Sequence, residues 1–222
     1  MTEAEWFTSG SRVHMRHVLK GLGRYSPRRW IHFNLACIGR ARDLINDERC
    51  AHFLEELEAH MADGGRNTLR SFHREEEAVR DAIRHLWRRR DDPLRGARIV
   101  AARAVLTANS PSFASSENVA IAFQRRSYIE GLQERRRHCV LLRDIFVNPF
   151  RPCVFSSEWR TSTTIALAAQ MYESRDFSAI PILADAFQEA GCEDDVLLTH
   201  CRDPKQVHVR GCWIVDLLLG KE

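Results

Sequence analysis

Apolar residues recur every three or four positions along most of the chain, which is the spacing of one face of an α-helix. In residues 26–46 this spacing follows Ser26, a preferred N-cap residue, and Pro27, which suits the first turn of a helix. Strand-like composition is confined to residues 153–155. The pattern therefore predicts an all-α protein, folded as a multi-helix bundle.

The same spacing predicts further helices over residues 47–65, 67–90, 92–109 and 119–146, and shorter ones over 164–174, 180–191, 193–201 and 209–220. Residues 119–146 form the longest pattern and predict a long central helix. Pro149 and Pro152 must interrupt any helix because proline lacks an N–H and restricts the residue before it. We therefore expect an N-terminal helical bundle over residues 1–147 and a compact C-terminal helical subdomain over 148–222, packed on the first.

The charge distribution follows this division. The chain has 222 residues, of which 44% are hydrophobic and 28% charged, and its net charge is only +3. Residues 1–150 contain 26 basic and 19 acidic residues, a net charge of +7, whereas residues 151–222 contain 7 and 11, a net charge of −4. A basic part and an acidic part can attract each other, or the basic part can face an anionic partner.

Cysteine and histidine residues near the end of the chain form a candidate metal or thiol site. A metal or thiol site there would draw on Cys192, His200, Cys201, His208 and Cys212. The segment lacks a Cys-x-x-Cys pair, and adjacent residues such as His200 and Cys201 point about 100° apart on a helix, so these two are not expected to share one metal. The preferred interpretation is packed, reduced thiols with no cofactor, and zinc is the alternative.

Cys212 is also a candidate nucleophile, because it lies near the start of the last predicted helix and His208 precedes it by four residues. Trp213 and the apolar residues that follow indicate that this turn is buried. A buried thiol is therefore preferred to a catalytic one, and no catalytic residue is assigned.

Asp216 stands in the middle of an apolar helical pattern, where a carboxylate is costly unless it is paired or lies at the solvent edge. Residues 141–146 contain Arg143 within another apolar run. We therefore predict a structural ion pair between Arg143 and Asp216, with a solvent-edge position of Asp216 as the alternative.

Arginine clusters are the candidate contacts for an anion or a nucleic acid. They comprise Arg88, Arg89, Arg90, Arg125, Arg126, Arg135, Arg136 and Arg137. Acidic residues are interleaved with them, and no zinc finger or RNA-binding aromatic signature accompanies them. A solvated helix face, or pairing with the acidic C-terminal part of the chain, is therefore preferred, and nucleic-acid binding is the alternative.

No apolar run of the length of a transmembrane helix occurs, and the first residues lack the apolar stretch of a signal peptide. We therefore expect a cytoplasmic protein with no membrane partner. Its seven scattered cysteines do not resemble a disulfide framework.

Residues 141–152 (LLRDIFVNPFRP) and 208–221 (HVRGCWIVDLLLGK) resemble a family of uncharacterised bacterial proteins that share the motifs RDIFxNPFRP and HVRGCWxVDLLLGK. The opening MTEAEW is similar to the start of that family as well. Members often carry a cysteine-rich stretch where this chain has FNLACIGR, with Cys37 alone. The resemblance implies no activity.

Phosphate-binding loops, dinucleotide fingerprints and hydrolase motifs are missing from the sequence. We therefore expect a non-enzymatic all-α interaction or regulatory module that binds a protein partner or itself. The alternatives are a metal- or thiol-dependent protein that uses residues 192–212, and a nucleic-acid-associated protein that uses the arginine-rich helices.

Overall fold

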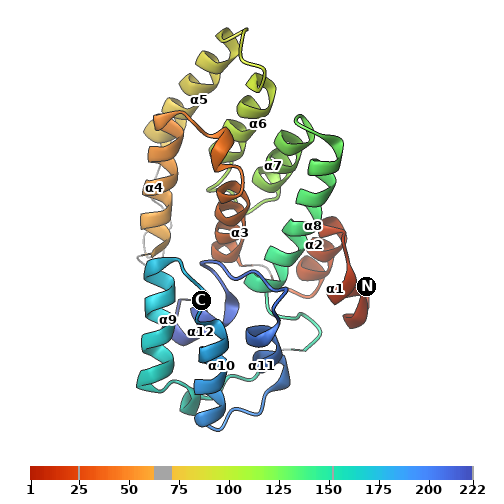
Figure 1. The fold of residues 1–222 in the computed structure, drawn as a ribbon, viewed down its shortest axis with the longest axis vertical. Helices are drawn as coiled ribbons and strands as arrows, with labels where there is room; N and C mark the ends of the chain where they lie inside the picture. Colours follow the sequence, from red (N-terminus) through yellow and green to blue (C-terminus); the bar gives the residue numbers. More distant parts are fainter. Residues whose placement is uncertain (25, 63–71, 152, 222) are drawn as a thin grey trace. The chain divides into compact units, whose positions relative to one another are not determined.

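The computed structural model describes residues 1–24, 26–62, 72–151 and 153–221 (Figure 1). Within these ranges the regular structure consists of α-helices and two short 3₁₀-helices, without a β-strand. The predicted all-α class is confirmed, and residues 153–155 form no strand.

The chain divides into two compact units, which are described separately. Unit 1 comprises Met1–Tyr25 and Cys139–Glu222, and unit 2 comprises Ser26–His138. The helices of unit 2 are α3 (Pro27–Gly39), η1 (Arg42–Leu44), α4 (Glu48–Ala62), α5 (His73–Arg88), α6 (Arg95–Leu106) and α7 (Ala114–Gln124). Those of unit 1 are α1 (Glu3–Thr8), α2 (Arg12–Gly21), η2 (Ser157–Trp159), α9 (Ser162–Ser174), α10 (Ile180–Glu189), α11 (Asp195–Arg202) and α12 (Trp213–Leu219). Helix α8 (Tyr128–Ile145) contributes its first part to unit 2 and its last residues to unit 1.

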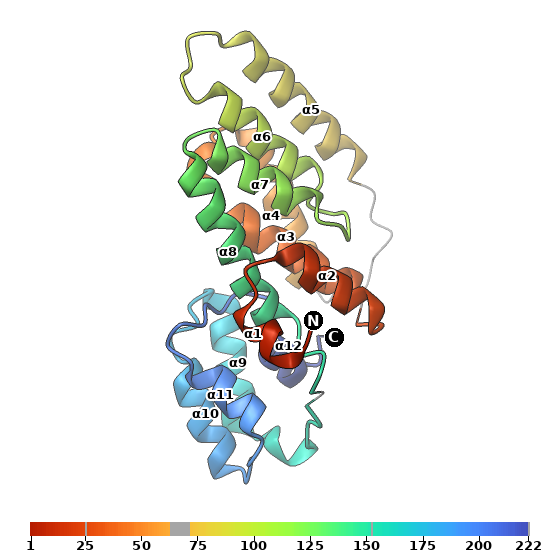
Figure 2. The same cartoon turned by 90° about the vertical axis from the view of Figure 1, so that its right-hand side faces the viewer.

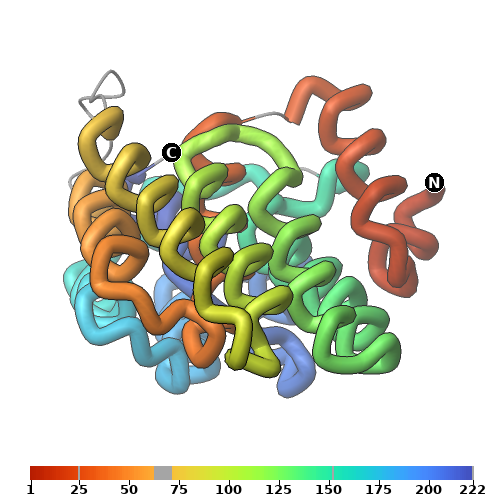
Figure 3. The backbone as a smooth tube through the Cα atoms, turned by 90° about the horizontal axis from the view of Figure 1, so that it is seen from above, coloured from red at the N-terminus to blue at the C-terminus, as the bar shows by residue number. Residues whose placement is uncertain are grey.

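Unit 2 is a helical bundle in which α6 packs against both α5 and α7 (Figure 3). Its core includes Trp30 and Phe33 on α3, whose rings meet Phe113 edge-on at centroid distances of 4.9 and 5.7 Å. Edge-to-face pairs of this kind add to the stabilisation that burial alone provides. Ser26 caps α3 and Pro27 occupies its first turn, as the sequence predicts.

Unit 1 is built on the C-terminal helices, where α9 packs against α10 and α12, and α10 packs against α11. Trp213 and Phe187 are fully buried in its core. Helix α1, which the hydrophobic pattern did not predict, lies beside the end of α8 (Figure 2). There Arg143 donates hydrogen bonds to the carbonyl oxygens of Trp6 (3.0 Å) and Ser9 (2.7 Å), near the C-terminal end of α1.

Asn148 Nδ2 also donates to Glu3 Oε1 at 2.7 Å, so the N-terminal residues contact the C-terminal part of the chain across the expected boundary at residue 147. The compact units therefore differ from the expected subdomains 1–147 and 148–222, because the first 25 residues belong with the C-terminal helices.

The predicted single helix over residues 119–146 is wrong, because α7 ends at Gln124 and α8 begins at Tyr128. A tight turn joins the two helices, and a Cβ atom added at Gly131 would lie 2.6 Å from the Cβ atom of Gln124. Gly131 thus permits an approach that any larger residue would block. The pattern of apolar residues continues across this turn and gives no sign of it.

Candidate metal centre

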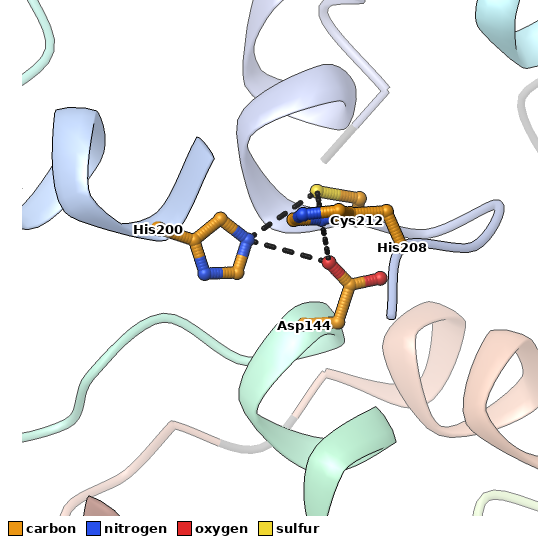
Figure 4. A group of neighbouring side chains, drawn as sticks. All are labelled: Asp144, His200, His208 and Cys212. Atoms are coloured by element: carbon orange, nitrogen blue, oxygen red, sulfur yellow. Dashed lines mark hydrogen bonds and ion pairs between the residues drawn. The ribbon is translucent and has the colours of Figure 1, made fainter. Parts of the chain in front are cut away.

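Four side chains of unit 1 converge on one point, and they come from three segments of the chain (Figure 4). Asp144 lies in the last turn of α8, and His200 lies near the end of α11. His208 and Cys212 stand at either side of a turn that precedes α12, in which the Cys212 N–H donates to the Val209 carbonyl oxygen. One ligand atom from each of the four residues lies within 4.8 Å of the others.

The local structure fixes each contributor. The Asp194 side chain caps α11 by accepting a hydrogen bond from the Leu197 N–H, which sets the start of the helix that carries His200. The turn before α12 needs Gly211, whose φ of +93° favours glycine. The Asp144 carboxylate is held by the Val209 N–H, which donates to its Oδ2 atom at 2.9 Å.

The distances inside the cluster are close to the edges of a zinc tetrahedron. Bond lengths of about 2.0–2.3 Å place two nitrogen or oxygen ligands about 3.4 Å apart, and nitrogen and sulfur about 3.6 Å apart. His200 Nε2 lies 3.3 Å from Asp144 Oδ1. Cys212 Sγ lies 3.7 Å from His200 Nε2 and 3.8 Å from His208 Nδ1. His208 Nδ1 lies 2.7 Å from Asp144 Oδ1, a hydrogen-bond length, so these two atoms must separate by about 0.7 Å to share a zinc ion.

The choice of ring nitrogens separates a metal site from a catalytic triad. In a triad the histidine uses one nitrogen for the nucleophile and the other for the carboxylate. Here Nδ1 of His208 faces both Cys212 and Asp144, and Nε2 of His200 also faces both of them. The four ligand atoms therefore point toward a shared centre rather than along a proton relay.

The pKa values of the cluster show which of its groups are charged when no cation is bound. Burial raises the pKa of Asp144, but hydrogen bonds from His200 and His208 outweigh it, so this pKa lies below its ordinary value. Burial lowers the pKa of His200, against the influence of Asp144, which favours the neutral ring. Burial, followed by the nearby Asp144 charge, raises the pKa of Cys212 well above the ordinary thiol value. The protein thus buries the Asp144 carboxylate beside a Cys212 thiol and a His200 ring for which burial favours the neutral forms.

A cavity of about 450 Å³ borders this cluster within unit 1 and is lined in part by His200 and Trp213. The His200 side chain is 11% exposed, whereas Asp144 is completely buried. His200 and His208, which is 8% exposed, are thus the members of the cluster nearest to solvent.

The structure brings together three of the five cysteine and histidine candidates, namely His200, His208 and Cys212, and leaves the other two outside. Cys201 is buried next to His200 in sequence but faces another way, as expected for neighbours on a helix. Cys192 is also buried and outside the cluster. The seven cysteines are free thiols, and Cys212 is completely buried, in agreement with the expected buried thiol.

Asp144 is the member of this cluster that the sequence analysis does not include among its candidates. It lies beside Arg143 in the apolar run 141–146, and that run does meet the C-terminal segment, but through Asp144 rather than through Arg143. In the described part of the chain no ion pair joins Arg143 to Asp216, because the Arg143 guanidinium is directed to α1. The solvent-edge alternative is also wrong, because Asp216 is only 1% exposed.

The arginine candidates all lie in unit 2 and fall into two groups. Arg126, Arg135 and Arg137 form ion pairs with Asp43, Glu117 and Glu134, respectively. Arg88, Arg89, Arg90, Arg125 and Arg136 are exposed and form no ion pair with a described residue. These three partners lie in unit 2 and not in the acidic C-terminal part of the chain, and the exposure of the other five arginines agrees with a solvated helix face.

Comparisons with models of known protein families, with curated proteins and with solved structures give no match to this chain. The resemblance of residues 141–152 and 208–221 to a bacterial family stays a prediction. Among the described residues, every helix is too short or too polar to span a lipid bilayer.

Proposed function

We propose that this protein binds one zinc ion through Asp144, His200, His208 and Cys212, and that the ion has a structural role. The observation that carries the proposal is that each histidine turns a single ring nitrogen toward both the carboxylate and the thiol. A metal ion placed between the four residues would contact all four of these donor atoms at once.

The donor set favours zinc over the hard divalent cations. One thiolate, two imidazoles and one carboxylate match the ligands that zinc takes in proteins, whereas calcium and magnesium prefer oxygen ligands throughout. With Cys212 deprotonated, the two negative ligands balance the two positive charges of the ion. Burial of the neutral centre then costs less than burial of the Asp144 charge alone.

The site supports a structural role because its four protein ligands fill a tetrahedron and leave no position open for a substrate. The ion would join the end of α8 to α11 and to the turn before α12, three segments that only tertiary structure brings together. A zinc-stabilised helical unit of this kind suits an interaction or regulatory module, which is the role we propose for the whole protein.

Metal analysis of the purified protein tests the proposal. We expect about one zinc ion per chain to survive dialysis, and we expect Cys212→Ser and His200→Ala to abolish it. Cys201→Ser is the matched control, because Cys201 is equally buried, adjacent to His200 and outside the cluster. Wild-type protein without zinc after growth in zinc-supplemented medium would contradict the proposal, and so would equal zinc loss from Cys201→Ser and Cys212→Ser.

Cobalt substitution provides a second readout that does not depend on stoichiometry. Tetrahedral cobalt with a thiolate ligand absorbs visible light strongly and shows a sulfur-to-metal charge-transfer band in the near ultraviolet. We expect both features in the wild-type protein, and loss of the charge-transfer band in Cys212→Ser. An octahedral cobalt spectrum from the wild-type protein would contradict the four-ligand site.

A further inference from the structure

Two arginine clusters that lie far apart in the sequence meet at one end of unit 2. Arg88, Arg89 and Arg90 follow one another where α5 ends, and α6 begins at Arg95. Arg125 lies at the end of α7, and its Nη1 atom is 3.2 Å from the position that a Cβ atom would occupy at Gly96. The turn between α5 and α6 and the turn between α7 and α8 are thus neighbours (Figures 2 and 3).

The arginines at this end carry charge that the protein itself does not neutralise. Five of them form no ion pair with a described residue: Arg88, Arg89, Arg90, Arg95 and Arg125. In contrast, Asp92 is engaged by Arg98 at 2.8 Å, and Asp43 by Arg126 at 2.8 Å. Asp91 is exposed beside the five arginines, and Glu130 shares Arg126 with Asp43. The five arginines still outnumber these acidic residues, so this surface keeps a positive charge.

Exposed aromatic rings accompany both arginine clusters. Trp87 precedes Arg88 on the last turn of α5 and is 54% exposed. Tyr128 starts α8 and is 65% exposed, and Ile129 beside it is 64% exposed. Large rings are normally buried, so two of them beside unneutralised arginines point to a ligand that has both negative charge and flat apolar faces.

We propose that these five arginines, with Trp87 and Tyr128, form a basic–aromatic surface that binds single-stranded nucleic acid. Phosphates pair with the guanidinium groups, and unstacked bases lie on the two rings. A duplex keeps its bases stacked inside and an acidic peptide has no array of flat rings, so neither makes use of Trp87 and Tyr128. This proposal does not rest on the metal centre, since all seven residues belong to unit 2.

Fluorescence anisotropy with a labelled oligothymidylate of about 20 nucleotides, which covers a typical site size of about 4–16 nucleotides, tests the proposal. If all five arginines contact phosphates, we expect the affinity to fall about 100-fold between about 50 and 200 mM salt. Arg89→Gln with Arg90→Gln should weaken binding and make the salt dependence shallower. Trp87→Ala and Tyr128→Ala should each weaken binding about fivefold or more, and this loss should persist at the higher salt, because stacking is not screened by ions.

The matched control is Arg80→Gln with Arg84→Gln, which removes two exposed arginines of α5 that are already paired with Glu76, Glu77 and Asp81. We expect this double variant to bind oligothymidylate as the wild type does. All the substituted side chains are exposed, and circular dichroism verifies that each variant is folded.

Three results would overturn the proposal. The first is failure of the wild type to bind oligothymidylate at low salt. The second is tighter binding of a duplex of the same length, with no effect of Trp87→Ala or Tyr128→Ala. The third is equal binding of polyglutamate, which would identify an acidic protein as the partner instead.

Discussion

Helix α8 carries two completely buried carboxylates, Glu134 and Asp144, and their surroundings differ in kind. Glu134, in unit 2, accepts hydrogen bonds from Arg40 on both oxygen atoms and from Arg137 at 3.3 Å, and it lies 3.3 Å from His138. Asp144, in unit 1, faces two imidazoles and a thiol, and a backbone N–H. The first carboxylate is balanced by permanent cations of the protein, whereas the side chains around the second are all of types that also bind metals.

This contrast shows how a structural ion pair differs from a candidate metal centre. The guanidinium groups of Arg40 and Arg137 donate hydrogen bonds to the Glu134 carboxylate, so its charge is balanced without a further component. Around Asp144, the two histidine nitrogens lie 2.7 and 3.3 Å from the carboxylate and 3.8 and 3.7 Å from the Cys212 sulfur. All four ligand atoms lie within 4.8 Å of one another, so they are within reach of one ion. Burial and a neighbouring histidine are shared by both sites and do not tell them apart.

The largest expected effect concerns the zinc ligands, because the proposed ion replaces the cations that Asp144 lacks. We expect Cys212→Ser to weaken zinc binding by more than about 100-fold, beyond the effect of losing a supporting residue. Zinc should stabilise the wild type by about 4 kcal/mol when free zinc exceeds the dissociation constant about 1,000-fold. Thermal unfolding with and without zinc measures the stabilisation of the wild type and its loss in the variant. Equal stabilisation of wild type and variant would show that Cys212 does not bind the ion.

Glu134→Gln is the counterpart of that experiment in the other unit. It leaves Arg40 and Arg137 beside an uncharged group, and we expect the free energy of unfolding to fall by about 3 kcal/mol. Zinc content should not change, because Glu134 has no part in the metal centre. Urea unfolding and metal analysis of one preparation test both statements, and loss of zinc from this variant would contradict the distinction between the sites.

The stabilisation that Glu134 provides is expected to depend on pH. Burial raises the pKa of Glu134, but hydrogen bonds from His138 and Arg40 outweigh it and lower this pKa from 4.5 to about 2. Because the folded-state pKa is the lower one, the stabilisation is fully present above about pH 4.5 and is lost as the pH falls toward 2, by about 3 kcal/mol in total. Urea unfolding between pH 6 and pH 3 (about one pH unit per step) checks this loss against Glu134→Gln, which should lack it. A variant with the same acid sensitivity as the wild type would show that other groups cause the loss.

The smallest effect is expected for Arg143→Met, beside Asp144. It removes two hydrogen bonds to the end of α1, and we expect a loss of about 1–2 kcal/mol, because water can replace part of what the carbonyl groups lose. Zinc affinity should stay within a factor of two or so of the wild type, since Arg143 contacts no ligand. A large drop in zinc affinity would show that Arg143 has a part in the metal centre.

The sequence predicts the helical class and several helix starts because these depend on local signals, such as Ser26 and Pro27 at the start of α3. It also identifies the region of the candidate metal centre, since His200, His208 and Cys212 are among the five candidates. A spacing of four residues would place His208 and Cys212 on one face of a helix, whereas the structure brings them together across a turn that depends on Gly211. The position of Gly211 three residues after His208 is the signal that predicts such a turn.

Asp144 and the break before α8 depend on tertiary contacts, which leave no periodic trace in the sequence. Arg143 and Asp144 are adjacent charges in one apolar run, and a helix turns them about 100° apart, so only one of them can face the C-terminal segment. The sequence does not decide which. The packing of α1 against Arg143 decides it in the structure, and α1 is a helix that the hydrophobic pattern does not reveal.

X-ray absorption spectroscopy at the zinc edge, on protein purified with its metal, measures the ligands of the proposed ion directly. For the proposed site we expect a first shell of one sulfur at about 2.3 Å and three nitrogen or oxygen atoms at about 2.0–2.2 Å, with imidazole scattering from two histidines. The sulfur should be replaced by a lighter atom in Cys212→Ser and retained in Cys201→Ser. A first shell of nitrogen and oxygen alone in the wild-type protein, or a sulfur that survives Cys212→Ser, would contradict the account.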